Sequence, residues 1–246
     1  MNLSHRAILF GAAAALLIGF SKTGMPGAGI PAVAMMVEVF RENTKLSVGA
    51  ILPLLILGDL LAIVYYRRHA DWARLLELCP YVVLGMVPAY LVLRYADDDT
   101  LRVSIGALIL VLLLLHVLRQ HYGFRRVADQ WWFTAATGIL AGFATTVSNA
   151  AGPIMGIYLV GRHMDKHRFL GTSAWFFFLV NASKVPGYTM LGMMTGETLR
   201  LALVLAPLVA GGAILGITVL KRIPQAVFDV LVLALAGVAA VRMMWS

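Results

Sequence analysis

Long apolar segments, separated by short polar turns, run through most of this chain. The longest of them lie at 48–66, 75–93, 101–118, 169–191, 199–220 and 227–241. At 1.5 Å per residue of helix, each is long enough to span, or nearly span, the hydrocarbon of a bilayer. Charged residues collect between these segments. The pattern predicts an all-α, multi-pass membrane protein.

A break in the apolar pattern occurs twice. The run GFSKTGMPGAG at 19–29 returns as GFATTVSNAAG at 142–152, and at a constant offset of 123 residues five of the eleven positions are identical. Both copies interrupt an apolar stretch with Gly, Pro or small polar residues. Paired interruptions in the two halves of a membrane chain are typical of a transporter's substrate site.

The duplication predicts a first membrane repeat at 1–120, a linker at 121–130 and a second repeat at 131–246. We expect about five helical segments per repeat and eight to ten helices in all, at 7–22, 26–40, 46–66, 75–94 and 101–119, and at 132–146, 149–161, 169–191, 199–220 and 227–244. The first two segments of each repeat are short. They form either a re-entrant hairpin or two tilted crossings with an unwound joint.

Composition and charge agree with a membrane protein. The chain is 61% hydrophobic and 13% charged, with a mean hydropathy of +0.85. The formal net charge of +8 comes from basic loops, which the positive-inside rule places in the cytoplasm. These loops lie at 67–74, 119–126, 162–168 and 221–222. We therefore expect a bacterial-type inner (plasma) membrane location, with the lipid bilayer as a partner and no nucleic acid. A homodimer is left open.

The loop charges also predict that the two repeats are inverted. The loop at 41–45 faces outward by the charge rule, whereas its equivalent at 164–168 faces inward. A slightly larger offset of 127 matches Pro80 with Pro207 and Gly85 with Gly212, and the offset of 123 matches Tyr65 with Tyr188. The expected architecture is two inverted-topology repeats, each beginning with broken or re-entrant helices.

The two breaks carry the chemistry of an anion site. The start of a helix presents unpaired N–H groups and a positive dipole end, and here helices restart after Pro26 and Asn149. If both starts meet near the middle of the membrane, they favour a small anion. The candidate substrate ligands around them are Ser21, Lys22, Thr23, Gly24, Gly27, Thr145, Thr146, Ser148 and Asn149. The alternative is that the small residues serve only close helix packing.

Three charges within apolar sequence are further candidates, because an isolated charge inside a bilayer is costly. They are Lys22 at the first break, Asp59 and Lys184. In the functional interpretation, Lys22 or Lys184 binds the anion, and Asp59 together with Lys184 couples its movement to a proton. In the structural interpretation, Asp59 and Lys184 form a permanent ion pair, and Lys22 extends to water.

The glycine-rich break at 19–24 with its continuation at 26–29, together with its echo at 142–153, resembles the TauE/SafE family of sulfite and sulfonate exporters. The resemblance covers nearly the whole chain. It implies secondary transport of a small anion, such as sulfite, a sulfonate like sulfoacetate, or a short carboxylate, with export as the usual direction.

Motifs of enzymes are absent from the sequence. The chain contains no metalloprotease helix motif, no nucleophile elbow, no phosphate-binding loop and no Cys/His spacing for a metal. We expect neither an enzyme nor a cofactor or metal, and transport driven by a substrate or ion gradient. An anion channel of similar architecture is the main alternative, followed by a membrane-embedded enzyme or a lipid flippase.

Overall fold

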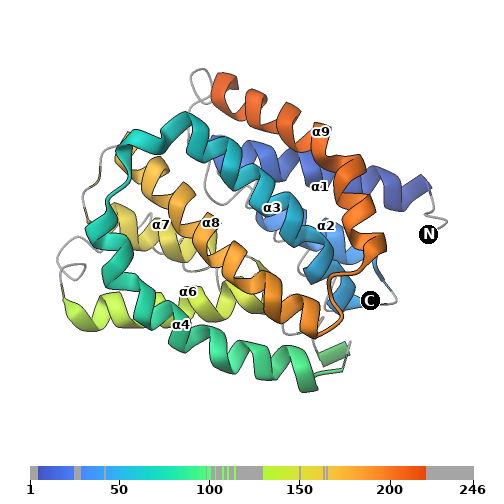
Figure 1. The fold of residues 1–246 in the computed structure, drawn as a ribbon, viewed down its shortest axis with the longest axis horizontal. Helices are drawn as coiled ribbons and strands as arrows, with labels where there is room; N and C mark the ends of the chain where they lie inside the picture. Colours follow the sequence, from blue (N-terminus) through green and yellow to red (C-terminus); the bar gives the residue numbers. More distant parts are fainter. Residues whose placement is uncertain are drawn as a thin grey trace.

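A computed structural model gives the fold (Figure 1). It describes residues 5–24, 29–41, 43–97, 99–100, 130–149, 151–162, 164 and 166–219, with a few single positions between 103 and 114. The expected helices at 101–119 and 227–244, and nearly all of the expected linker at 121–130, lie outside the described residues.

The described part of the chain is helical and contains no strand. Its α-helices are α1 (His5–Thr23), α2 (Ile30–Val39), α3 (Thr44–Tyr66), α4 (Trp72–Tyr95), α6 (Trp131–Ser148), α7 (Gly152–Gly161), α8 (Lys166–Met190) and α9 (Gly196–Val219), and the short 3-10 turn η1 (Arg67–His69) follows α3. Every end lies within three residues of the expected one except the start of α2, which is four residues later. The two short helices, α2 and α7, are the ones that begin later than expected, by four and three residues, whereas the other helices begin one to three residues earlier.

Local signals explain several of these boundaries. The side chain of Asn43 accepts a hydrogen bond from the Leu46 amide at the start of α3, and Asp71 accepts one from Arg74 at the start of α4. Asn149 adopts a left-handed backbone conformation, with φ of 55°, and ends α6. Because a left-handed residue cannot continue an α-helix, α7 starts only at Gly152.

Four described helices are long and apolar enough to cross a membrane, namely His5–Thr23, Thr44–His69, Trp72–Tyr95 and Gly196–Thr218. Helix α8 is also long, but Asn181 and Lys184 interrupt its apolar sequence. Helices α2 and α7 have ten residues each, or about 15 Å, which is half the thickness of the hydrocarbon. The prediction of a multi-pass, all-α membrane protein is confirmed.

The two outer pairs of helices pack in a pattern that exchanging the two repeats would conserve. In Figure 1, α1 and α9 lie side by side along one edge, α4 and α6 lie along the opposite edge, and α3 and α8 run between them. At the sequence offsets given above, α1 to α4 correspond to α6 to α9. The first helix of each repeat thus packs on the fourth helix of the other repeat.

Matched glycines make these two contacts close. A Cβ atom at Gly19 of α1 would collide with the Val209 carbonyl of α9, and one at Gly142 of α6 would collide with the Val82 carbonyl of α4. The partner helices contribute glycines of their own, Gly212 and Gly85, which meet the backbone of α1 and α6 in the same way. The glycines shared by the two breaks therefore serve helix packing as well as any role at a binding site.

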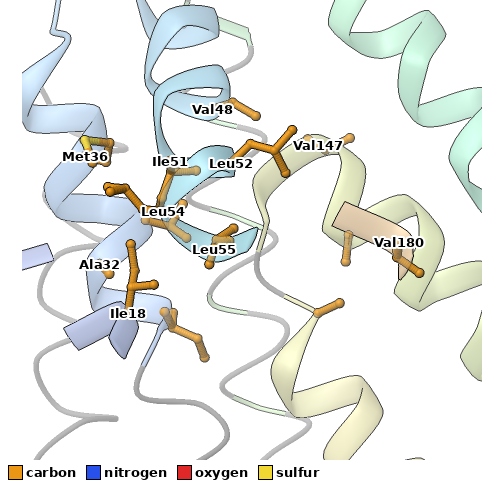
Figure 2. Close-up of a cluster of buried hydrophobic side chains, with 14 of the residues drawn as sticks. Ile18, Ala32, Met36, Val48, Ile51, Leu52, Leu54, Leu55, Val147 and Val180 are labelled. Atoms are coloured by element: carbon orange, nitrogen blue, oxygen red, sulfur yellow. The ribbon is translucent and has the colours of Figure 1, made fainter. Parts of the chain in front are cut away.

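The apolar core surrounds the first part of α3. Figure 2 shows Val48, Ile51, Leu52, Leu54 and Leu55 of this helix between two groups of side chains. On one side lie Ile18, Ala32 and Met36 from α1 and α2, and on the other lie Val147 and Val180 from α6 and α8. All of these side chains are less than one tenth exposed. Helix α3 thus joins the broken segments of both repeats.

Candidate functional site

A cavity of about 50 Å³ lies between the two broken segments. Its polar lining comes from Ser21 and Lys22 of α1, Asp59 of α3, Asn149 at the end of α6, and Ser173 of α8. Apolar side chains, including Ile18, Leu55 and Phe177, complete the wall. Both breaks and both central helices therefore contribute polar groups to one partly open, largely apolar cavity.

The starts of the two short helices meet at this cavity. Gly29 and Ile30 at the start of α2, and Gly152 at the start of α7, belong to its lining. The first turn of each helix directs backbone N–H groups, and the positive end of the helix dipole, toward the cavity. Two such helix starts favour an anion, while the charge of Lys22 in the lining is balanced by that of Asp59.

Lys22 and Asp59 form an ion pair in the cavity wall. The Lys22 Nζ atom lies 2.7 Å from Asp59 Oδ1, the Asp59 side chain is fully buried, and that of Lys22 is 12% exposed. Asn181 Nδ2 donates a hydrogen bond of 2.7 Å to the other carboxylate oxygen. The ammonium also lies 4.2 Å from the centre of the Phe177 ring, a favourable cation–π contact.

This pairing contradicts one of the two interpretations of the sequence, the structural one, in which Asp59 pairs permanently with Lys184 and Lys22 extends to water. In the structure Asp59 pairs with Lys22, because Gly58 leaves room for the Lys22 stem to pass over α3. A Cβ atom at Gly58 would lie only 2.9 Å from Lys22 Cγ. Sequence offsets compare levels along helices but carry no information on which helix face a neighbour meets.

Lys184 instead contacts the second break. Its Nζ atom, fully buried, lies 2.9 Å from the Thr145 carbonyl oxygen, 3.1 Å from Thr145 Oγ1 and 2.6 Å from Asn149 Oδ1. Asn149 Nδ2 in turn donates to the Val48 carbonyl at 3.0 Å. The amine thus caps the end of α6, where backbone carbonyls have no partner within the helix. Its contacts hold the left-handed Asn149 against α3.

Two tyrosines bind the ends of the broken helices in the same way. The Tyr66 hydroxyl donates to the Thr23 carbonyl at 2.9 Å, and the Tyr188 hydroxyl donates to the Thr146 carbonyl at 2.6 Å. Thr23 and Thr146 are equivalent at the offset of 123, and the two tyrosines at 122. The expected match of Tyr65 with Tyr188 is therefore wrong by one residue; Tyr65 is half exposed, because adjacent helix residues face different directions.

Of the predicted substrate ligands, Ser21, Lys22 and Asn149 line the cavity. Several others direct their hydroxyl groups to backbone carbonyls: Thr23 to Gly19 and Ala213, Thr146 to Gly142, and Ser148 to Ala144. Gly24 packs against Gly216 of α9, and Thr145 contacts Lys184. Gly27 lies outside the described residues. None of the five described residues in this group is part of the cavity lining.

Sequence reasoning missed Ser173. Its side chain is 7% exposed, its Oγ atom has no hydrogen-bond partner among the described residues, and it lines the cavity. A buried hydroxyl without a partner is uncommon, so it is a further candidate ligand. The available signal was the polar pair Thr172-Ser173 within an apolar helix, which the repeat does not reproduce in α3.

Long apolar helices, two broken segments and a charged cavity between them define a multi-pass membrane protein of the transporter type. Residues 8–243 match the family model described as sulfite exporter TauE/SafE, and the chain belongs to this family. It is accordingly a membrane transporter and not an enzyme. Separate comparisons with curated proteins and with solved structures found no match.

Proposed function

We propose that this protein is a secondary transporter that exports a small anion across the inner (plasma) membrane by alternating access. The observation that carries the proposal is the cavity at which the Lys22–Asp59 pair and the starts of α2 and α7 meet. The anion binds to Lys22, to the first backbone N–H groups of both short helices, and to the hydroxyl groups of Ser21 and Ser173.

The proposed coupling ion is a proton, carried by Asp59. When the anion reaches Lys22, it competes with the Asp59 carboxylate for the same ammonium. A proton on Asp59 removes this competition and leaves no unpaired buried carboxylate. Anion and proton therefore bind together, and release of the proton restores the ion pair. Each transported anion is accompanied by one proton in this scheme.

The size of the cavity favours a compact substrate. A single water needs about 10–15 Å³ of such space, so about 50 Å³ admits a ligand of roughly four heavy atoms. Sulfite has this size, whereas sulfoacetate and taurine are longer. Within the proposed class, we therefore expect sulfite to be transported faster than sulfonates with a two-carbon chain.

The test is anion flux in proteoliposomes that contain the purified protein. Sulfite, sulfoacetate, taurine, lactate and sulfate are compared with and without a pH gradient, with the K22M variant as the control. We expect saturable sulfite transport that K22M abolishes. A pH gradient should accelerate this transport when the compartment that sulfite leaves is the more acidic one. Equal, negligible flux of all five anions would contradict the proposal. Electrical currents far above the turnover of a carrier, with no uphill exchange, would identify an anion channel instead.

A further inference from the structure

The two repeats close differently at their far ends. At one end, Arg162, which directly follows α7, contacts α4 and α6. At the other, Gly11 of α1 lies beside Val39 of α2 and Leu205 of α9. We call these the Arg162 junction (Arg162, Glu77, Thr134) and the Val39 junction (Val39, Leu205, Gly11). Arg162 and Val39 are equivalent at the offset of 123, as are Thr134 and Gly11. At the offset of 127, Glu77 corresponds to Val204, which precedes Leu205 in the sequence.

The Arg162 junction is a network of charged hydrogen bonds. Arg162 Nη2 lies 2.9 Å from Glu77 Oε1 of α4 and 2.8 Å from Thr134 Oγ1 of α6, and Thr134 Oγ1 lies 3.2 Å from the same carboxylate oxygen. The Arg162 side chain is only 4% exposed. Arg74 pairs with the second oxygen of Glu77 at 2.9 Å, on the exposed side. Charged hydrogen bonds of this kind are stronger than neutral ones and restrict geometry.

The Val39 junction has only apolar contacts between the equivalent positions. A Cβ atom at Gly11 would lie 3.5 Å from Leu205 Cδ1 and 3.8 Å from Val39 Cγ2, which is ordinary van der Waals contact. Val39 and Leu205 are both buried. Apolar contacts restrict sliding and rotation less than a charged network does, because they are not directional.

Each junction lies at the far end of a short helix whose start lines the cavity. Helix α7 runs from Gly152 at the cavity to Gly161, directly before Arg162, over about 15 Å. A path along α7 from that end of the molecule to the cavity would open if α7 moved away from α4 and α6. The Arg162–Glu77 pair opposes this movement directly.

We propose that the Arg162 junction is the gate at one end of the cavity, closed in this conformation by the Arg162–Glu77 pair, and that the Val39 junction is the weaker gate at the other end. The basic loops place the Arg162 junction on the cytoplasmic side. A role as a gate rests on the proposed transport function. The difference between the two junctions predicts which end of the cavity opens when the Arg162–Glu77 pair is removed, whatever the transported molecule is.

The test is the accessibility of a cysteine in the cavity. Ser173 is replaced by Cys in a C79S background, and a membrane-impermeant maleimide is applied to inverted and to right-side-out membrane vesicles. The gate variant carries R162M and E77M together, since apolar side chains of similar size replace a buried pair without leaving an unpaired charge. R74Q is the matched control, because it removes the exposed partner of Glu77 and leaves the Arg162–Glu77 pair intact.

We expect the double variant to raise the labelling rate from the cytoplasmic side by about tenfold or more, since open minor states of such proteins are populated at about 0.1–10%. R74Q should change it by less than about twofold. Unchanged labelling of the double variant, or an equal rise from both sides, would overturn the proposal. If the double variant does not fold, T134V removes two of the hydrogen bonds and should raise cytoplasmic labelling by a smaller factor; no rise would again overturn it.

Labelling needs no substrate, so this result is independent of the transport assay. If the double variant is labelled faster as expected but the protein transports no anion, the gate is supported and the proposed substrate is rejected. Sulfite transport with no change in labelling would retain the proposed substrate and reject the gate. L205A, which loosens the opposite junction, should raise labelling from the external side only; a cytoplasmic rise as large as that of the double variant would overturn the assignment.

Discussion

The two breaks share a scaffold but differ in their charges. Each begins a repeat with a helix that ends near the middle of the fold, and each helix end receives a tyrosine hydroxyl, from Tyr66 or Tyr188. Each also packs through a matched glycine, Gly19 or Gly142. These common features satisfy the backbone carbonyls that a broken membrane helix leaves without partners. The scaffold is what the duplication conserved.

The lysine lies on the broken helix at the first break but on the neighbouring long helix at the second. At the first, Lys22 lies on the broken helix and reaches Asp59 on α3. At the second, Thr145 occupies the position of Lys22, and the lysine, Lys184, reaches it from α8. Lys22 lines the cavity and can meet a ligand, whereas the contacts of Lys184 are all with the protein. The comparison teaches that two similar breaks can place their lysines differently, one at the cavity wall and one against a helix end.

The largest expected difference in stability is between substitutions at the equivalent positions Lys22 and Thr145. K22M leaves the buried Asp59 carboxylate without its cation and should destabilise the protein by about 3–5 kcal/mol, whereas T145V removes one hydrogen bond and should cost about 1 kcal/mol. Thermal unfolding in detergent measures both. The double variant K22M/D59N should recover most of the stability but no anion flux. Equal destabilisation by K22M and T145V would contradict this difference between the two breaks.

Matched glycines should give large and similar effects at both breaks. G19A and G142A each place a methyl group against a carbonyl of the packed helix, so each should destabilise by about 1–3 kcal/mol. G11A is the control on the same face of α1, where the methyl group would meet only side chains at ordinary contact distance. The same thermal measurement applies. A tolerated G142A beside a damaging G19A would show that the two packing contacts are not equivalent.

The tyrosines test the shared scaffold at a smaller scale. Y66F and Y188F each remove one buried hydroxyl and leave a carbonyl without its partner, at a cost of about 1–2 kcal/mol. Y65F should stay within about 0.5 kcal/mol, because Tyr65 is half exposed. Urea-dependent unfolding, followed by tryptophan fluorescence, measures the three variants. The equivalence fails if Y65F is as damaging as Y66F.

The smallest effect concerns the backbone at the second break. N149A and N149G both lose the hydrogen bonds to Lys184 and Val48, but only alanine is strained at a φ of 55°. N149A should therefore be less stable than N149G by about 1 kcal/mol, the usual cost of a left-handed conformation for a residue with a Cβ atom. If N149A is more stable than N149G, the left-handed conformation at residue 149 is not what ends α6.

Much of the fold could be predicted from sequence because it follows from local patterns. The apolar segments fixed the number and approximate ends of the described helices, and the repeated run at 19–29 and 142–152 located both breaks. The starts of α2 and α7 were placed too early, since the conformation of Asn149 cannot be read from hydropathy. The inverted relation of the repeats stays a prediction, although the contacts of α1 with α9 and of α4 with α6 are those that an exchange of halves would conserve.

The site was only partly predictable. Lys22, Asp59 and Lys184 stood out because charges are costly within apolar helices, but the sequence did not show that Asp59 pairs with Lys22 rather than with Lys184. Ser173 had only the weak signal of a polar pair within an apolar helix, since a hydroxyl group there can bond to its own helix. The Arg162–Glu77 pair had none, since charged residues next to loops are common. Hydroxyl groups of Thr146 and Ser148 drew attention by their position in the break, yet they bond to their own helix.

The sequence by itself determined that this protein lies in the membrane as a duplicated set of helices, because periodicity, length and hydropathy act within single segments. Only the tertiary structure decided that Lys22 meets Asp59, that Lys184 holds Asn149, and that a tight cavity remains between them. These outcomes depend on helix rotation and on the space left by residues such as Gly58. Both are properties of packed pairs of helices, which no single segment encodes.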